Sequence, residues 1–169
     1  MACTLTSGFD EFKLCVNINT TIEKVYKAWA TSAGLESWFL RKAVFQDNNG
    51  NNRSATEMIQ ENDNYTMLWY GYPDIVAERG KVLKANGENV FSFTFSMGCS
   101  VSIRIFSEHN ETIVELIESN LPTDEETKMK HYVGDIKGWT FYLANLKSVL
   151  EGGLDLRNKR VELVDVITA

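Results

Sequence analysis

The longest regular pattern in the sequence is an apolar stripe near the C-terminus. Apolar residues recur there at alternating steps of three and four, the spacing that places side chains on one face of an α-helix. The stripe consists of Met129, Tyr132, Ile136, Trp139, Leu143, Leu146 and Leu150. Thr123 and Glu126 form a capping box ahead of it, and Gly152-Gly153 follows as a stop signal. The pattern predicts one long helix that ends at Leu150 and measures about 40 Å.

Upstream of this stripe, apolar and polar residues alternate in several short runs, which is typical of half-buried β-strands. The first run, Phe12 to Ile18, is followed by helical spacing that starts at a capping box of Thr20 and Glu23, with Thr21 as an alternative N-cap. The later runs lie between residues 43 and 118 and are separated by turn signals such as Asn86-Gly87. The order predicts an α+β protein with one strand, two short helices, five or six further strands and the long helix.

Length and charge restrict the class of protein. A chain of 169 residues is most simply one domain, 1–169, which can remove roughly 70% of its unfolded surface from water. The formal charge of −6 repels phosphate backbones and anionic lipid surfaces. No apolar stretch approaches the ~20 residues that span a bilayer, and the N-terminus lacks the pattern of a signal peptide. We therefore expect a cytoplasmic protein that binds neither nucleic acid nor membranes.

Residues that carry catalysis or hold metals are sparse. Cys3, Cys15 and Cys99 lack the paired spacing of a zinc site. No Ser or Cys is flanked by the glycines of a nucleophile elbow, and no glycine-rich loop opens a helix to hold phosphate. A pair formed by Glu78 and Glu118 is the remaining arrangement that fits proton transfer. The sequence predicts no catalytic residue, no metal site and no cofactor.

Several short motifs follow one another in a fixed order along nearly the whole chain, from about Phe12 to Arg157. They are Thr21 to Tyr26, Trp38-Phe39, Glu78 to Val82, Thr112 to Glu118 leading into Leu121-Pro122, and Gly138-Trp139 with Leu143, Leu146-Lys147 and Leu150-Glu151. This order resembles the START-like, or Bet v 1-like, helix-grip superfamily. Within that superfamily it is similar to the C-terminal domain of the activator of Hsp90 ATPase.

The resemblance implies a helix-grip fold, in which a curved antiparallel sheet of six to seven strands wraps around the long C-terminal helix. Two short helices follow the first strand, and an apolar cavity lies between sheet and helix. The domain core is expected at about 11–157, with a partly apolar C-terminal tail at 158–169. The family often has Pro where Ile22 stands and His where Glu118 stands, so an inherited role for Glu118 is not implied.

The strand and helix patterns direct a set of apolar side chains toward the space between sheet and helix. The set is Trp38, Met67, Trp69, Phe93, Phe95, Leu116, Trp139 and Leu143. The rings either fill one another's space as ordinary core or line a pocket of roughly 300–1,000 Å³ for a flat apolar ligand. The curvature of the sheet favours the pocket, because a stiff helix cannot follow a concave surface.

Glu118 is the polar candidate for this site. Strand alternation places it on the same face as Val114 and Leu116. It is either a polar contact for a ligand hydroxyl or amine, with a pKa raised by desolvation, or a solvated residue beyond the buried part of its strand.

These patterns support a leading hypothesis of non-catalytic binding of a small apolar molecule. The resemblance implies two alternatives: a co-chaperone that activates an Hsp90-type chaperone through protein contact, and an enzyme like the cyclases or hydrolases of the wider superfamily. Gly134, Gly138, Phe141 and Asn145 lie opposite the apolar stripe and either meet a second chain or indicate that the helix begins later. We expect a monomer or a weak homodimer.

Overall fold

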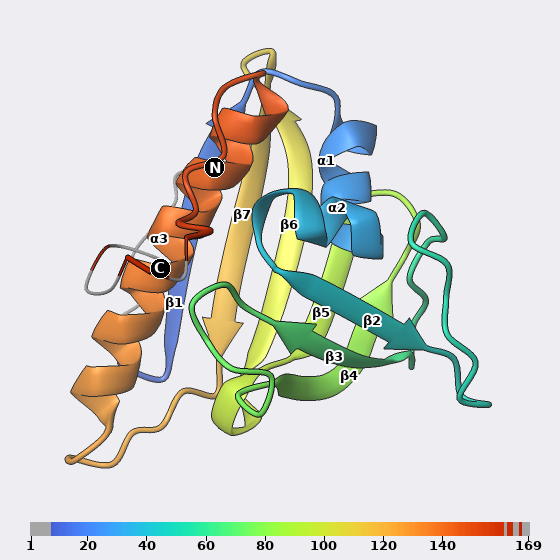
Figure 1. The fold of residues 1–169 in the computed structure, drawn as a ribbon. Coiled ribbons are helices and arrows are strands. Elements are labelled where there is room, and N and C mark those ends of the chain that lie inside the picture. Colours follow the sequence, from blue (N-terminus) through green and yellow to red (C-terminus); the bar gives the residue numbers. More distant parts are fainter. Residues whose placement is uncertain (1–7, 161, 164–165, 167–169) are drawn as a thin grey trace.

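The computed structural model describes residues 8–160, 162–163 and 166 (Figure 1). Part of the predicted tail, including Val161, Val164 and Ile167, lies outside the described residues. The elements in chain order are β1 (Glu11–Ile18), α1 (Ile22–Ala30), α2 (Ser32–Trp38), β2 (Lys42–Gln46), β3 (Asn64–Leu68), β4 (Glu78–Ala85), β5 (Val90–Thr94), the 3-10 turn η1 (Ser96–Gly98), β6 (Ser100–Glu108), β7 (Glu111–Ser119) and α3 (Lys128–Leu150).

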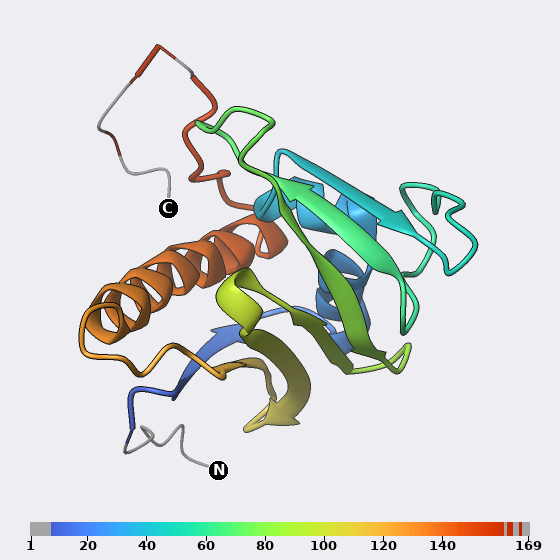
Figure 2. The same cartoon turned by 90° about the horizontal axis from the view of Figure 1, so that it is seen from below.

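The seven strands form one antiparallel sheet in the order β1-β7-β6-β5-β4-β3-β2. A register shift between Val82 and Lys84 interrupts the pairing of β4 with β5, and such irregularities bend a sheet. Figures 1 and 2 show the sheet curving from β1 to β2, with all three helices on its concave side. Helix α3 packs along β1 and against α2. The predicted α+β helix-grip fold is confirmed.

The short helices begin where hydroxyl side chains cap them. Of the two candidate N-caps, Thr21 is the cap of α1, since its hydroxyl accepts a hydrogen bond from the backbone N–H of Lys24. Thr31 ends α1 and caps α2 by accepting from the backbone N–H of Gly34 at 2.9 Å. The two helices therefore meet at one residue, which directs the aromatic side chains of both into the same core.

The long helix is shorter than the sequence indicates. Helix α3 begins at Lys128, with Thr127 as its N-cap residue. The expected capping box at Thr123 does not start the helix; ahead of α3, the Asp124 carboxylate accepts from the backbone N–H of Thr127 at 3.0 Å. The 23 residues of α3 span about 34 Å. Met129, expected on the buried stripe, is 53% exposed. Full burial on this helix begins only at Trp139.

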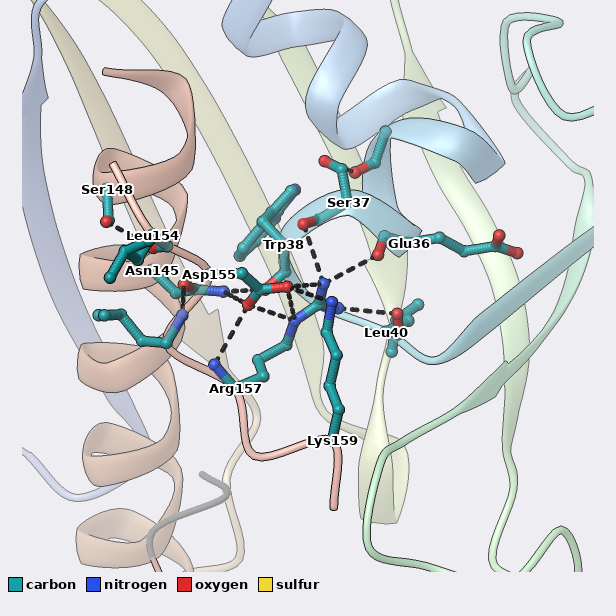
Figure 3. Close-up of polar contacts among 12 residues, drawn as sticks. Glu36, Ser37, Trp38, Leu40, Asn145, Ser148, Leu154, Asp155, Arg157 and Lys159 are labelled. Atoms are coloured by element: carbon teal, nitrogen blue, oxygen red, sulfur yellow. Dashed lines mark hydrogen bonds and ion pairs between the residues drawn. The ribbon is translucent and has the colours of Figure 1, made fainter. Parts of the chain in front are cut away.

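The segment after α3 is held against α2 by one buried arginine (Figure 3). The guanidinium of Arg157 donates hydrogen bonds to the carbonyl oxygens of Glu36 at 3.0 Å, Ser37 at 2.9 Å and Leu40 at 2.8 Å. The carbonyls of a helix's last turn have no partner within the helix, so these bonds cap α2 from outside.

Two further side chains complete this cluster. Asn145, fully buried on α3, donates to the carbonyl oxygen of Trp38 at 2.6 Å and accepts from the backbone N–H of Leu156 at 2.7 Å. The Asp155 carboxylate pairs with Arg157 at 2.6 Å, so the buried guanidinium charge is compensated. The placement of Asn145 on the outer side of the long helix was wrong, because its amide turns inward to the end of α2.

Candidate ligand-binding cleft

An open cleft of about 230 Å³ lies between α3, the loop at residues 69–77 and the end of β5. Its lining is mainly aromatic and comes from four parts of the chain that are distant in sequence. The lining residues are Phe39, Trp69, Tyr72, Val76, Phe95, Gly134, Asp135, Gly138, Trp139 and Tyr142.

The cleft wall is a connected set of rings. The Phe39 ring lies 4.6 Å from Tyr142 and 5.2 Å from Trp139, centroid to centroid. The Phe95 ring lies 5.6 Å from Trp139 and 6.4 Å from Trp69. Edge-to-face and tilted contacts at these distances stabilise aromatic pairs, so each ring fixes the orientation of the next.

The structure brings three of the nine predicted site residues to the cleft, namely Trp69, Phe95 and Trp139. Four others are fully buried in the core and do not line it: Trp38, Met67, Phe93 and Leu116. Leu143 is also buried, and it lines a separate groove of about 250 Å³ beside Leu14 and Val16 of β1.

The cleft is smaller than the range expected from the sequence because α1 and α2 fill most of the concave space. The Trp38 ring stacks on Phe39 at 5.2 Å, and the Trp29 ring meets Trp38 edge-on at 4.6 Å. Both alternatives that the sequence left open are therefore partly realised. Some of the rings form ordinary core, and the outermost rings line an open space.

Sequence reasoning missed several lining residues. Tyr72 and Val76 lie in a loop without periodicity, which carries no signal of burial. Asp135, Gly138 and Trp139, by contrast, follow helical spacing on one face of α3. The spacing is present in the sequence, but glycine and aspartate do not count as apolar positions, so the apolar pattern does not include them.

Glu118 is the ninth predicted residue and lies behind the cleft wall. Its side chain is fully buried, and its Oε2 accepts a hydrogen bond of 2.7 Å from the indole Nε1 of Trp139. Its Oε1 has no hydrogen-bond partner among the described residues. Burial, with a smaller effect of the Asp135 charge, raises the pKa of Glu118 to about 8. The interpretation of Glu118 as a solvated residue was wrong, since β7 remains buried through this position.

Further acidic groups lie near Glu118. Asp135 is partly buried in the cleft wall, and burial raises its pKa above the ordinary value. Burial raises the pKa of the nearby Cys99 thiol to about 11. The charges of Glu118, Asp135 and Glu78 act on that thiol in the same direction. Three carboxyl groups therefore lie within electrostatic range of one buried thiol.

Across residues 8–160, 162–163 and 166, no cluster of three or more His, Cys, Asp or Glu side chains could hold a metal ion. In the same part of the chain, no helix is long and apolar enough to cross a membrane.

The curved sheet, the long C-terminal helix and the aromatic cleft between them define a helix-grip protein of the START-like class. The family model described as "Activator of Hsp90 ATPase homolog 1-like protein" matches residues 19–151. The chain therefore belongs to this family, and the resemblance found in the sequence is confirmed.

Solved structures agree with this assignment. The protein SSP2350 from Staphylococcus saprophyticus is similar to this chain with a TM-score of 0.69 and 16% identity, over 87% of this chain and 96% of the other. The Aha1 dimer from Colwellia psychrerythraea gives a TM-score of 0.62 and 19% identity, over 85% and 97%. A search of curated proteins found no match. At these identities the neighbours establish the fold alone.

Proposed function

We propose that this protein binds a small, mainly apolar aromatic molecule in the cleft and does not transform it. The observation that carries the proposal is an open space of about 230 Å³ with a largely aromatic wall. Its rings come from α3, from the loop at residues 69–77, and from Phe39 and Phe95, which follow α2 and β5. Ligand sites in proteins are typically concave and apolar with few polar groups.

The size of the space restricts the ligand. A cavity of about 150 Å³ lined by apolar side chains holds benzene. A cleft of about 230 Å³ therefore suits a molecule of one or two rings. Trp69, Phe95 and Trp139 would contact it directly, whereas Glu118 would act by orienting Trp139. Trp38, Met67, Phe93, Leu116 and Leu143 would support the wall from behind.

The experiment is a thermal-shift screen with one- and two-ring fragments, followed by calorimetry. A ligand at a hundredfold excess over its Kd should stabilise the protein by about 2.7 kcal/mol. The variant Gly138→Leu should lose this shift, because a Cβ at Gly138 meets no atom within 4 Å and a larger side chain would occupy the cleft. Lys137→Leu, one residue away and exposed, is the matched control. Shifts that persist in Gly138→Leu would place the ligand elsewhere.

Family membership supports a second candidate, contact with an Hsp90-type chaperone. A cytoplasmic protein, monomeric or weakly dimeric, would fit this role. Stimulation of chaperone ATP turnover by both wild type and Gly138→Leu would favour chaperone contact, since the cleft is not needed for it. Turnover that does not change with added protein would count against it.

A further inference from the structure

The acidic groups beside the cleft, Asp135 and Glu118, have no cationic partner among the residues that the structure describes. Asp135 lines the cleft, and its carboxylate makes no hydrogen bond or ion pair with any described residue. Glu118 is fully buried, with one oxygen unpartnered. Buried carboxylates are normally paired with a cation, and leaving one unpaired is costly.

The nearby cations do not fill this role. His131 lies one helical turn before Asp135 and acts on it only through its charge, not through a hydrogen bond. Arg157 acts on Tyr142 at another part of the cleft wall, but its guanidinium is already paired with Asp155 and with three carbonyl oxygens. Among the described residues, no lysine or arginine forms an ion pair with Asp135, Glu118 or Glu78.

The aromatic rings of the cleft are also suited to binding a positively charged group. Faces of Trp, Tyr and Phe attract a cation placed within about 6 Å of the ring centre, with Trp the strongest. Trp139 donates its N–H to Glu118 at 2.7 Å. A hydrogen bond to an acidic group polarises the donor, which makes the indole face more electron-rich. Trp69 and Phe95 continue this surface around the cleft.

From these observations we propose that the cleft ligand is an organic ammonium ion, held between the faces of Trp69 and Trp139 and the carboxylate of Asp135. This inference rests on the proposed function, since it names the chemical class of the molecule that the cleft binds. The apolar part of the ligand would contact the rings, and its positive charge would compensate the charge of the Asp135 carboxylate. A cation would also favour the ionised form of Glu118, whose pKa is otherwise raised by burial.

The test compares two molecules of the same shape that differ in charge, phenyltrimethylammonium and tert-butylbenzene. Binding of each to the full chain is followed through the indole N–H signals of the tryptophans by NMR at constant ionic strength. We expect the cation to bind at least tenfold more tightly than the neutral molecule. We also expect Asp135→Asn to weaken binding of the cation at least fivefold and to leave tert-butylbenzene unaffected.

Glu61→Gln provides the charge-matched control, since it removes one negative charge from an exposed turn outside the cleft. It should not change the affinity for either molecule. Equal or tighter binding of tert-butylbenzene would overturn the ammonium inference while leaving the proposed function intact. Cation binding that Asp135→Asn leaves unchanged would overturn the role of Asp135. Failure of both molecules and of the fragment screen would remove the proposed function itself.

Discussion

Two polar clusters border the aromatic wall, and they differ in how completely their charges are satisfied. In the Arg157 cluster, every group is paired: the guanidinium with Asp155 and three carbonyl oxygens, and Asn145 with both α2 and the C-terminal segment. In the acidic cluster, Glu118 has one hydrogen bond to Trp139, and Asp135 has none among the described residues.

The difference separates a structural role from a binding role. A fully paired buried cluster fixes one arrangement of the chain, because breaking any pair leaves an isolated charge. An incompletely paired cluster costs stability in the free protein, and an external partner can recover that cost. The first cluster therefore stabilises the fold, and the second is the one that the proposed ligand would complete.

The largest expected effect is that of removing the Arg157 side chain charge. Arg157→Met should destabilise the protein by about 3–5 kcal/mol, because Asp155 and the carbonyls at the end of α2 lose their partner. Urea unfolding measures this loss. Lys159→Met is the control, since Lys159 also pairs with Asp155 but is about half exposed, and it should cost less than about 1 kcal/mol. Similar losses in both variants would contradict the distinction.

Glu118→Gln should stabilise the protein in alkaline solution. The folded pKa of Glu118, about 8, lies above its ordinary value of 4.5, so the folded state holds the proton more tightly. In wild type, the stability that the protonated Glu118 contributes to the fold is fully present below about pH 4.5 and is lost as the pH rises through 8. At pH 9 the free energy of unfolding of the variant should exceed that of wild type by roughly 2–5 kcal/mol, and at pH 4.5 the two values should be equal.

Urea unfolding at both pH values measures this difference, with Glu61→Gln as the exposed control that should follow wild type. A difference between Glu118→Gln and wild type that does not change with pH would show that Glu118 titrates normally in the fold.

Trp139→Phe should lower the free energy of unfolding by about 1–3 kcal/mol, a smaller effect, because it leaves the buried Glu118 carboxyl without its hydrogen-bond donor. The same change should raise the pKa of Glu118 further, which NMR titration of its side-chain carbon would detect. Trp69→Phe is the control, since the Trp69 indole makes no hydrogen bond to the described residues. It should leave that pKa unchanged.

The smallest expected effect concerns the helical side of the cleft. Gly138→Ala should stabilise α3 by about 1 kcal/mol, because alanine is the better helix former and its Cβ meets no atom within 4 Å. The same methyl group would narrow the cleft, so calorimetry should show weaker ligand binding. Unchanged affinity would indicate that the ligand does not reach this part of the helix.

The sequence predicts the fold well because its signals are local. The alternation of apolar and polar residues predicts the strands. In β7 it correctly assigns Val114, Leu116 and Glu118 to the buried face. The stripe around Trp139 gives α3, although it does not reveal that the first turns of the helix are exposed. Hydrophobic periodicity marks which face is apolar, and it carries no information on where the core ends.

The site is less predictable because its interactions join distant parts of the chain. Nothing near Arg157 indicates that it caps a helix more than a hundred residues earlier. Its partners are backbone carbonyls, which every residue carries, so no particular residue type marks them in the sequence. In the sequence, Asp135 resembles any surface acid, and only the fold brings it to the same cleft as Trp69 and Phe95. The glycines of α3 were interpreted as contacts with another chain or as signs of a later helix start, whereas Gly134 and Gly138 lie within α3 and line the cleft.

The cap on α2 also has a consequence for the order of events during synthesis. The hydrogen bond from Arg157 to the carbonyl of Leu40 spans 117 residues. Strand β1 likewise cannot pair until β7 has been synthesised. A ribosome adds about 5–20 residues per second, so roughly 6 to 23 seconds pass between the two partners. The N-terminal half must therefore emerge unfinished, and α2 lacks its external cap until the segment around Arg157 leaves the exit tunnel.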